Sequence, residues 1–240
     1  MVFNHRDRIK SRASLSPFWL MPAVAVWLSL SGVVVHAQSV HPITGRRIAP
    51  VMGLSGADWL DREDRQREEQ PEKAIAELNL KPGMNVGDVG AGTGFYSLRV
   101  AKAILPGGVV YANDIQRGML ERIEANAAAQ HLTNVITVLG VETDPRLPAL
   151  KLDLVLLVDV YHEFSRPQRM LDRIHDSLKP SGRLVLLEFR KEDPAVPIRP
   201  EHKMSVEEVK AEVTPQGFEF EKVVDSLPWQ HIIFFTKAGR

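Results

Sequence analysis

Val86-Gly87-Asp88-Val89-Gly90-Ala91-Gly92-Thr93-Gly94-Phe95 is the stretch that decides the fold of this 240-residue chain. It predicts a short apolar strand from Asn85 to Val89, a turn with glycine at every second position, and a helix that opens near Phe95. Glycine has no Cβ atom, so the turn can take positive φ angles and let a ligand approach its backbone closely. The turn also lies at a strand end that leads into a helix N-terminus, where open α/β sheets bind ligands. The stretch therefore predicts a ligand-binding turn.

The charge beside the turn narrows the class of ligand. A nucleotide pyrophosphate suits a helix N-terminus, but the carboxylate of Asp88 repels it and attracts a sulfonium or an amino group instead. The spacing also departs from the dinucleotide fingerprint G-x-G-x-x-G, which requires glycine where Phe95 stands. The turn thus favours a cationic ligand over a dinucleotide.

Residues 88–94, Asp-Val-Gly-Ala-Gly-Thr-Gly, resemble motif I of the class I S-adenosylmethionine-dependent methyltransferases. The resemblance extends, through the order and spacing of elements, over residues 70–237. It implies S-adenosyl-L-methionine as the cofactor and in-line SN2 transfer of its sulfonium methyl group to a small-molecule acceptor. The sequence leaves the identity of that acceptor open.

The composition of the chain excludes several kinds of chemistry. Lysine and arginine number 30, aspartate and glutamate also number 30, and there is no cysteine. The absence of cysteine excludes disulfides, cysteine-bound zinc and a thiolate nucleophile. The balanced charge lacks the basic excess of nucleic-acid-binding proteins, so we expect no nucleic-acid partner.

The N-terminal segment has the pattern of an export signal. Arg6, Arg8, Lys10 and Arg12 precede an uncharged, apolar run, which ends at Val35-His36-Ala37. This pattern predicts a secretory signal peptide over residues 1–37 and an exported protein, periplasmic or secreted. The alternative is an uncleaved membrane anchor, because the uncharged run is about long enough to span a bilayer.

Residues 38–70 are predicted to form an N-terminal arm and the start of the first helix. Prolines and glycines over 38–65 predict an extended arm with turns. The apolar stretch 51–60 is expected to pack on the domain, either covering the mouth of the cofactor site or only burying Trp59 and Leu60. The charged run 61–70 is interpreted as a solvated helical face.

Residues 71–240 are predicted to form the methyltransferase domain. Apolar runs and helical periodicities alternate along it, which indicates a doubly wound, Rossmann-like α/β fold with a mostly parallel seven-stranded sheet. The last two strands are joined by Pro228-Trp229 without a helix, so they should form an antiparallel hairpin. The expected strands are Asn85–Val89, Val109–Asn113, Val135–Leu139, Leu152–Val158, Arg183–Phe189, Phe218–Leu227 and Gln230–Lys237.

The resemblance assigns cofactor-binding roles to residues at successive strand ends. Asp114, 20 residues beyond Gly94, is placed to accept the ribose hydroxyls. The family commonly has an aspartate where Val141 stands, so Glu142, Thr143 or Asp144 must take its place beside the adenine. The complete cofactor-binding set is Asp88, Gly90, Ala91, Gly92, Thr93, Gly94, Tyr96, Asp114, Ile115, Glu142, Thr143, Asp144 and Asp159.

The fourth strand ends in Asp159-Val160-Tyr161-His162-Glu163-Phe164, at the position of motif IV of the family. Its Tyr161-His162 pair resembles the pattern of small-molecule methyltransferases. We expect His162 to take a proton from the acceptor or to contact it, with Tyr161 and Glu163 as further catalytic candidates. The alternative role of His162 is structural, as a helix cap or a partner of a backbone carbonyl.

The remaining histidines carry weaker signals. His202 and His231 belong to the late stretches 202–204 and 229–231, which are candidates for the rim of the acceptor pocket, although we favour a structural role for each. The histidines are scattered and show no metal-ligand spacing, so we expect no metal ion. Two other functions stay open: a non-catalytic S-adenosylmethionine-binding protein, and a nucleotide-dependent oxidoreductase on a related fold.

Overall fold

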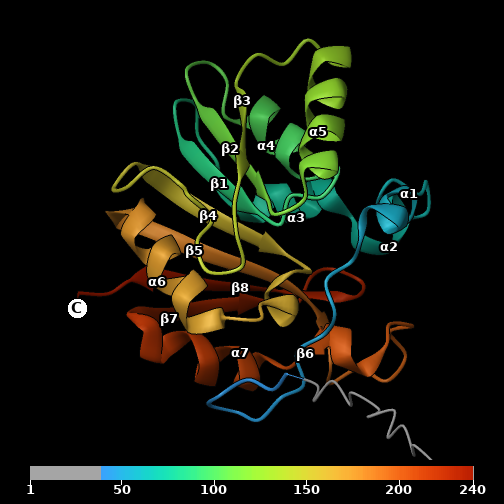
Figure 1. The fold of residues 1–240 in the computed structure, drawn as a ribbon, viewed down its shortest axis with the longest axis vertical. Helices are drawn as coiled ribbons and strands as arrows, with labels where there is room; N and C mark the ends of the chain where they lie inside the picture. The colour runs from blue at the N-terminus through green and yellow to red at the C-terminus, as the bar shows by residue number, and fades with distance from the viewer. Residues whose placement is uncertain (1–38, 240) are drawn as a thin grey trace, which may run out of the picture. The chain divides into compact units, whose positions relative to one another are not determined.

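The computed structural model describes residues 39–239, in which one mixed sheet is flanked by helices on both faces. Figure 1 shows the sheet from β3 to β7. The strands are β1 (Asn85–Val89), β2 (Val109–Asp114), β3 (Val135–Leu139), β4 (Leu152–Val158), β5 (Leu178–Arg190), β6 (Lys203–Met204), β7 (Phe218–Val224) and β8 (Gln230–Lys237). The α-helices are α1 (Ala57–Leu60), α2 (Arg65–Glu69), α3 (Pro71–Glu77), α4 (Ser97–Ala103), α5 (Arg117–Ala129), α6 (Pro167–Ser177) and α7 (Val206–Val213).

The order of the strands creates one switch point in the sheet. The order is β3-β2-β1-β4-β5-β8-β7, and the short β6 pairs with β5. The chain runs from β1 outward to β3 and then returns to β4 on the other side of β1. Ligands of doubly wound sheets bind at the carboxyl ends of strands at such a point. The glycine turn after β1 and motif IV after β4 therefore lie side by side.

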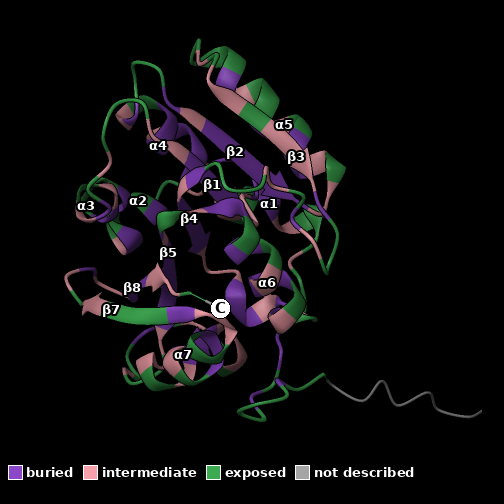
Figure 2. Cartoon of the chain, turned by 90° about the vertical axis from the view of Figure 1, so that its left-hand side faces the viewer, coloured by how far each residue is buried: buried purple, intermediate pink, exposed green. Residues whose placement is uncertain are grey.

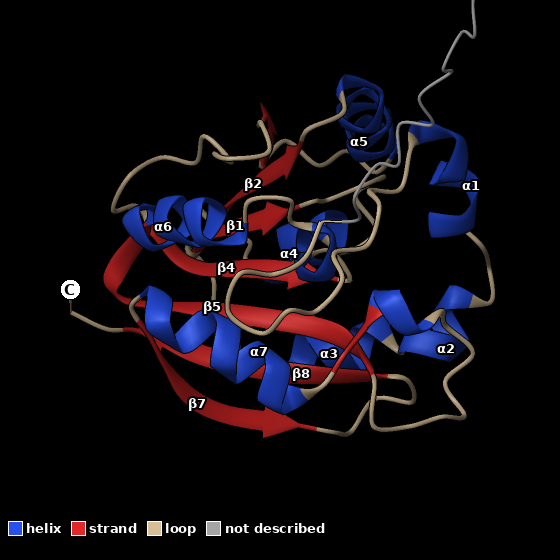
Figure 3. Ribbon diagram, turned by 60° about the horizontal axis from the view of Figure 1, so that its bottom comes forward, coloured by secondary structure: helices blue, strands red, loops and turns tan. Residues whose placement is uncertain are grey.

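Two hydrophobic clusters hold the helices to the sheet. On one face, α3, α4 and α5 pack against β1, β2 and β4 through residues such as Leu78, Val100 and Ile123. On the other, α6 and α7 pack through Ile174 and Val213. Figure 2 shows the burial of the central strands, and Figure 3 shows α6 and α7 together on one side of the sheet.

The predicted fold class is confirmed. β8 runs antiparallel to both β5 and β7, as the terminal hairpin predicts. Five of the predicted strands agree with the observed bounds within one residue. β5 instead begins at Leu178, because Leu152 pairs with Leu178 across an irregularity in the register, and β7 ends at Val224. The two-residue β6 has no sequence signal of its own.

The predicted signal peptide, residues 1–37, lies outside the described residues. Within residues 39–239, no helix combines the length and the apolar character needed to cross a membrane.

Candidate functional site

The glycine turn after β1 forms one side of a cavity of about 470 Å³. Gly90, Gly92 and Gly94 take φ angles of 72°, 56° and 88°, a region that strains any residue with a Cβ atom. A Cβ atom on Gly90 would lie 2.3 Å from Cγ2 of Val160, and one on Gly92 would lie 2.9 Å from Cδ1 of Leu60. The turn therefore requires glycine for its backbone conformation and for the close approach of neighbouring segments.

Asp88, at the end of β1, is almost completely buried beside the turn. The Ser97 hydroxyl donates a 2.5 Å hydrogen bond to its Oδ2 atom. Burial raises the pKa of Asp88 from 3.8 to about 6, against the lowering effects of the Ser97 hydroxyl and the Arg65 guanidinium. A cationic ligand beside this carboxylate would favour its charged form.

Asp114, at the end of β2, lies across the turn from Asp88. Its Oδ2 accepts a 3.1 Å hydrogen bond from the Gly92 N–H, and its Oδ1 accepts a 2.8 Å bond from the Gln116 N–H. Burial raises the pKa of Asp114 above its usual 3.8, and these backbone donors lower it. Each carboxylate oxygen retains a second lone pair, so both can still accept hydroxyl groups of a ligand.

The loop after β3 brings one of its three candidate residues to the cavity. Glu142 lies in the cavity wall, and its carboxylate accepts a 2.8 Å hydrogen bond from the Ser165 hydroxyl. Thr143 and Asp144 are not in the wall. Asp144 instead accepts a hydrogen bond from the Arg146 N–H at 2.7 Å. Glu142 is thus the candidate that can contact a ligand there.

Helix α2 contradicts the interpretation of residues 61–70 as a solvated face. Arg65 and Glu69 are buried and form a 2.8 Å ion pair, and the Arg65 guanidinium lies 4.1 Å from the centre of the Phe95 ring. Arg65 also lines the cavity. The i, i+4 spacing of the pair is visible in the sequence, but such pairs are usually exposed. In the folded protein the guanidinium instead packs on the rings of Phe95 and Tyr96.

Three buried oxygen atoms near Arg65 have no hydrogen-bond partner: Glu69 Oε2, the Tyr96 hydroxyl and Asp159 Oδ1. Tyr96 and Asp159 line the cavity. Buried polar groups are almost always satisfied, so these oxygens indicate a site for a ligand that donates hydrogen bonds. An ammonium group offers three such donors.

Asp159 follows β4 directly and has a strained backbone. Its φ angle of 50° is uncommon for a residue other than glycine. Oδ2 accepts a 2.7 Å hydrogen bond from the Gln230 amide. Burial raises the pKa of Asp159 well above its ordinary value, and the carboxylates of Glu69 and Glu188 raise it further. Strain of this kind concentrates at functional sites.

His162 lies in the 3₁₀ turn Tyr161–Glu163 and lines the same cavity. Its Nδ1 lies 2.6 Å from Oε2 of Glu188, which is fully buried on β5, so Nδ1 carries the proton and donates to this carboxylate. The Tyr161 N–H donates to the other oxygen of Glu188 at 3.0 Å. The Nε2 atom of His162 lies 3.1 Å from Nδ1 of His202.

Glu163 and His202 complete a polar group at this end of the cavity. Both line the wall, and Oε1 of Glu163 lies 4.0 Å from Nδ1 of His202. Burial raises the pKa of Glu163 to about 7, against the lowering effect of His162. His231 does not reach the cavity, because its ring nitrogens bond the carboxylates of Asp225 and Glu192.

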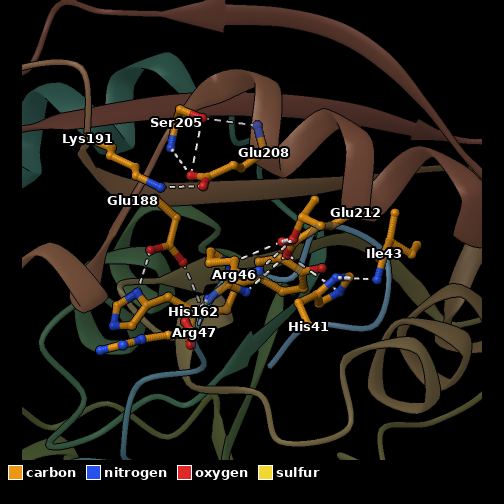
Figure 4. A network of polar contacts seen from close by, with 12 residues as sticks. His41, Ile43, Arg46, Arg47, His162, Glu188, Lys191, Ser205, Glu208 and Glu212 are labelled. Carbon is orange, nitrogen blue, oxygen red and sulfur yellow. Dashed lines mark hydrogen bonds and ion pairs between the residues drawn. The ribbon is translucent and has the colours of Figure 1, made fainter. Parts of the chain in front are cut away.

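The N-terminal arm holds the backbone of His162 in place. Nη1 of Arg46 and the N–H of Ala49 both donate to the His162 carbonyl, at 3.1 and 3.0 Å. Nε and Nη2 of Arg46 bond both oxygens of Glu212, a fully buried residue of α7. Figure 4 shows Arg46 between Glu212 and His162. The arm thus ties helix α7 to motif IV.

The structure brings most of the predicted site residues to one cavity. The predicted residues in its wall are Asp88, Gly90, Ala91, Gly92, Tyr96, Asp114, Ile115, Glu142, Asp159, His162 and Glu163. Those outside the wall are Thr93, Gly94, Thr143, Asp144 and Tyr161. Tyr161 is fully buried and packs edge-on against Phe164. Sequence reasoning missed Arg65 altogether and weighed His202 as a structural residue.

Comparison with known proteins decides the family. A family model described as a methyltransferase domain matches residues 80–232, which is more than half of the chain. The chain belongs to this methyltransferase family. A crystal structure of an S-adenosylmethionine-dependent methyltransferase from Aquifex aeolicus is similar, with a TM-score of 0.74 and 28% identity. The match covers 78% of this chain and 100% of the Aquifex aeolicus chain.

Curated relatives of the methyltransferase match over part of their length. The demethylmenaquinone methyltransferase of Symbiobacterium thermophilum is 34% identical over 118 residues, which are 49% of this chain and 47% of that protein. A ubiquinone/menaquinone biosynthesis C-methyltransferase, UbiE, of Burkholderia cenocepacia is 30% identical over 117 residues, 49% of this chain and 48% of that protein. The chain spans about half the length of the curated relatives it matches.

The methyltransferase uses S-adenosylmethionine, and the cavity fits this cofactor. The unpartnered oxygens of Glu69, Tyr96 and Asp159 suit its ammonium group. The free lone pairs of Asp114 suit its ribose hydroxyls, and the open backbone at Gly90 and Gly92 admits its methionine portion. These individual contacts stay predictions.

Proposed function

We propose that this methyltransferase methylates a hydroxylated, electron-rich aromatic ring of the quinol class. The observation that carries the proposal is the composition of the cavity beyond the cofactor residues, where an apolar wall ends in the polar group of His162, Glu163 and His202. The names of the curated relatives, which refer to demethylmenaquinone and to ubiquinone and menaquinone biosynthesis, support the same class of acceptor.

The apolar wall suits the body of a flat ring. It is formed by side chains from motif IV, α6, β5 and the loop before β6: Val160, Phe164, Met170, Phe189, Pro197 and Ile198. Pockets for small molecules commonly combine such a wall with a few placed polar groups that orient the ligand. Here the polar group at His162 and His202 would receive a ring hydroxyl.

The chain contributes binding and orientation to the reaction. When bound, S-adenosylmethionine supplies an electrophilic methyl group on a sulfonium. The acceptor forms the new bond to the methyl carbon with its own electron pair, the carbon–sulfur pair returns to sulfur, and the acceptor's proton leaves to water. Holding the two reactants in a near-attack geometry can lower the barrier by about 7–11 kcal/mol. Asp88, Asp114 and Asp159 hold one reactant, and the apolar wall holds the other.

The oxidation state of the acceptor gives a direct test. Full-length protein is incubated with S-adenosylmethionine and either a naphthoquinol or the matching naphthoquinone, and S-adenosylhomocysteine and the methylated product are measured by mass spectrometry. We expect methylation of the quinol alone, because the oxidised ring is electron-poor and cannot attack the methyl carbon. Equal turnover of both forms, or turnover of neither in protein that binds S-adenosylhomocysteine, would overturn the proposed acceptor class.

A further inference from the structure

Three potential metal ligands converge at the acceptor end of the cavity. His162 and Glu163 follow β4, and His202 ends the 3₁₀ turn Pro200–His202 just before β6. One ligand atom of each residue lies within 4.8 Å of the other two. The histidines are 40 residues apart along the chain, so no local spacing reveals the group.

The spacing of the two imidazole rings is compatible with both of them binding one ion. Nε2 of His162 and Nδ1 of His202 are 3.1 Å apart, and the rings are inclined at 83°. Two nitrogens that each bond one ion at about 2.1 Å lie about 3.0 to 3.4 Å apart for bond angles between 90° and 109°. The distance between the histidines therefore already fits a shared ion. The Glu163 carboxylate, whose Oε1 lies 4.0 Å from Nδ1 of His202, would complete the set by moving toward the ion.

The hydrogen bond on the far side of His162 fits the same role. Its Nδ1 donates to the buried carboxylate of Glu188, so the lone pair of Nε2 faces into the group. Histidines that bind metal ions almost always donate their other N–H to a carboxylate or a carbonyl in this way, which fixes the tautomer and the ring orientation. Arg46 and Ala49 also hold the His162 backbone. Figure 4 shows this fixed His162–Glu188 pair.

The charged side chains of the cavity wall favour the binding of a cation. Its acidic side chains are Asp88, Asp114, Glu142, Asp159 and Glu163. Two arginines, Arg65 and Arg199, oppose them. Acidic side chains thus outnumber arginines in the wall, and this imbalance favours cationic ligands.

We propose that His162, Glu163 and His202 bind one divalent transition-metal ion, with its open coordination positions toward the acceptor side of the cavity. Two imidazoles and one carboxylate favour Zn²⁺ and its neighbours in the first transition row over Mg²⁺ or Ca²⁺, which prefer oxygen ligands. An ion here would bind a hydroxyl oxygen of the acceptor as a Lewis acid. That second role rests on the proposed function, whereas the binding of the ion does not.

The test measures metal binding directly. Full-length protein is freed of metal with a chelator and titrated with Zn²⁺ by calorimetry and with Co²⁺ by visible absorption, which reports histidine coordination. We expect one ion per chain. His202→Ala should weaken binding by more than about tenfold, because it removes one of three protein ligands. Circular dichroism and S-adenosylhomocysteine binding establish that the variant is folded.

His231→Ala is the matched control. His231 also lies against two carboxylates, those of Asp225 and Glu192, but outside the proposed set, so its removal should leave the Zn²⁺ affinity unchanged. Wild-type protein that binds no stoichiometric ion would overturn the site, whatever the variants do. Binding that survives His202→Ala but is lost in His231→Ala would overturn it as well. If protein that binds no ion still methylates the quinol at full rate, the proposed function is supported and only the proposed metal site is wrong.

Discussion

The turn after β1 and helix α2 form two walls of one cavity, and they use charge in opposite ways. In the turn region, Asp88 and Asp114 accept hydrogen bonds from neutral donors, namely the Ser97 hydroxyl and backbone N–H groups. In α2, Arg65 and Glu69 are charges of opposite sign that neutralise each other. The first wall keeps its negative charge available to a ligand. The second uses most of its charge to hold the structure together.

This contrast separates stability from binding. Substitutions in α2 should act mainly on the free energy of unfolding, because removal of one charge leaves the other buried and unpaired. Substitutions in the turn region should act mainly on the cofactor and can even stabilise the free protein. Three variants test the contrast, in order of the expected effect.

Arg65→Ala should give the largest effect. It leaves the Glu69 carboxylate buried without its cation, which costs about 3–5 kcal/mol of unfolding free energy. Arg67→Ala is the matched control two residues away, because Arg67 pairs with Asp64 while its side chain is 77% exposed. Such surface pairs contribute about 0–1 kcal/mol. Urea denaturation measures both, and equal losses in the two variants would show that α2 does not depend on a buried pair.

Asp88→Asn should change stability in a pH-dependent way. The pKa of Asp88 in the folded protein is about 6, above the ordinary 3.8, so the folded state binds this proton more tightly than the unfolded state. The resulting stabilisation is present in full below pH 3.8 and is lost as the pH rises through 6. The difference between 6 and 3.8 corresponds to about 3 kcal/mol.

The asparagine variant remains neutral, so the wild-type protein should lose stability relative to it between pH 4 and 7 in the absence of cofactor. Denaturation curves at several pH values measure this difference. If the difference in unfolding free energy between the wild-type protein and Asp88→Asn is constant across that range, the pKa of Asp88 is not raised by its burial.

Asp114→Ala should have the smallest effect on stability of the three and a selective effect on the cofactor. We expect S-adenosylhomocysteine to bind about tenfold more weakly, which is about 1.4 kcal/mol, because the ribose hydroxyls lose their acceptors. Asp144→Ala serves as control, since Asp144 lies outside the cavity wall and should change the binding free energy by less than about 0.5 kcal/mol. Calorimetry compares the affinities of the two variants for S-adenosylhomocysteine. Weaker binding in Asp144→Ala alone would show that Asp144, and not Asp114, contacts the cofactor.

The parts of the fold that follow local rules were predictable from the sequence. The strand–turn–helix unit at 85–97 was predictable because positive-φ glycines and apolar runs act within a few residues. The antiparallel hairpin followed from the absence of a helix between the last two strands. The start of β5 at Leu178 was not predictable, since it depends on an irregular pairing with Leu152.

The candidate site was predictable only in its cofactor half. Asp88 and Asp114 lie at the carboxyl ends of β1 and β2, at positions that the family resemblance marks, and both reach the cavity. Arg65 and His202 could not be placed in the same way, because their burial and their neighbours come from segments far away in the chain. The run 61–70 has the composition of an exposed helix, and Arg65 is buried through tertiary contacts that include the rings of Phe95 and Tyr96.

The arm has a consequence for how the enzyme could diversify. Arg46 bonds both Glu212 of α7 and the His162 carbonyl, and Met52 and Leu60 line the cavity. All three residues precede position 80, where the match to the family model begins. A trimmed catalytic module that starts at residue 80 would retain the glycine turn but lose this support. Exchange of the N-terminal arm between homologues could therefore change the preferred acceptor without changing the strands that carry the cofactor-binding residues.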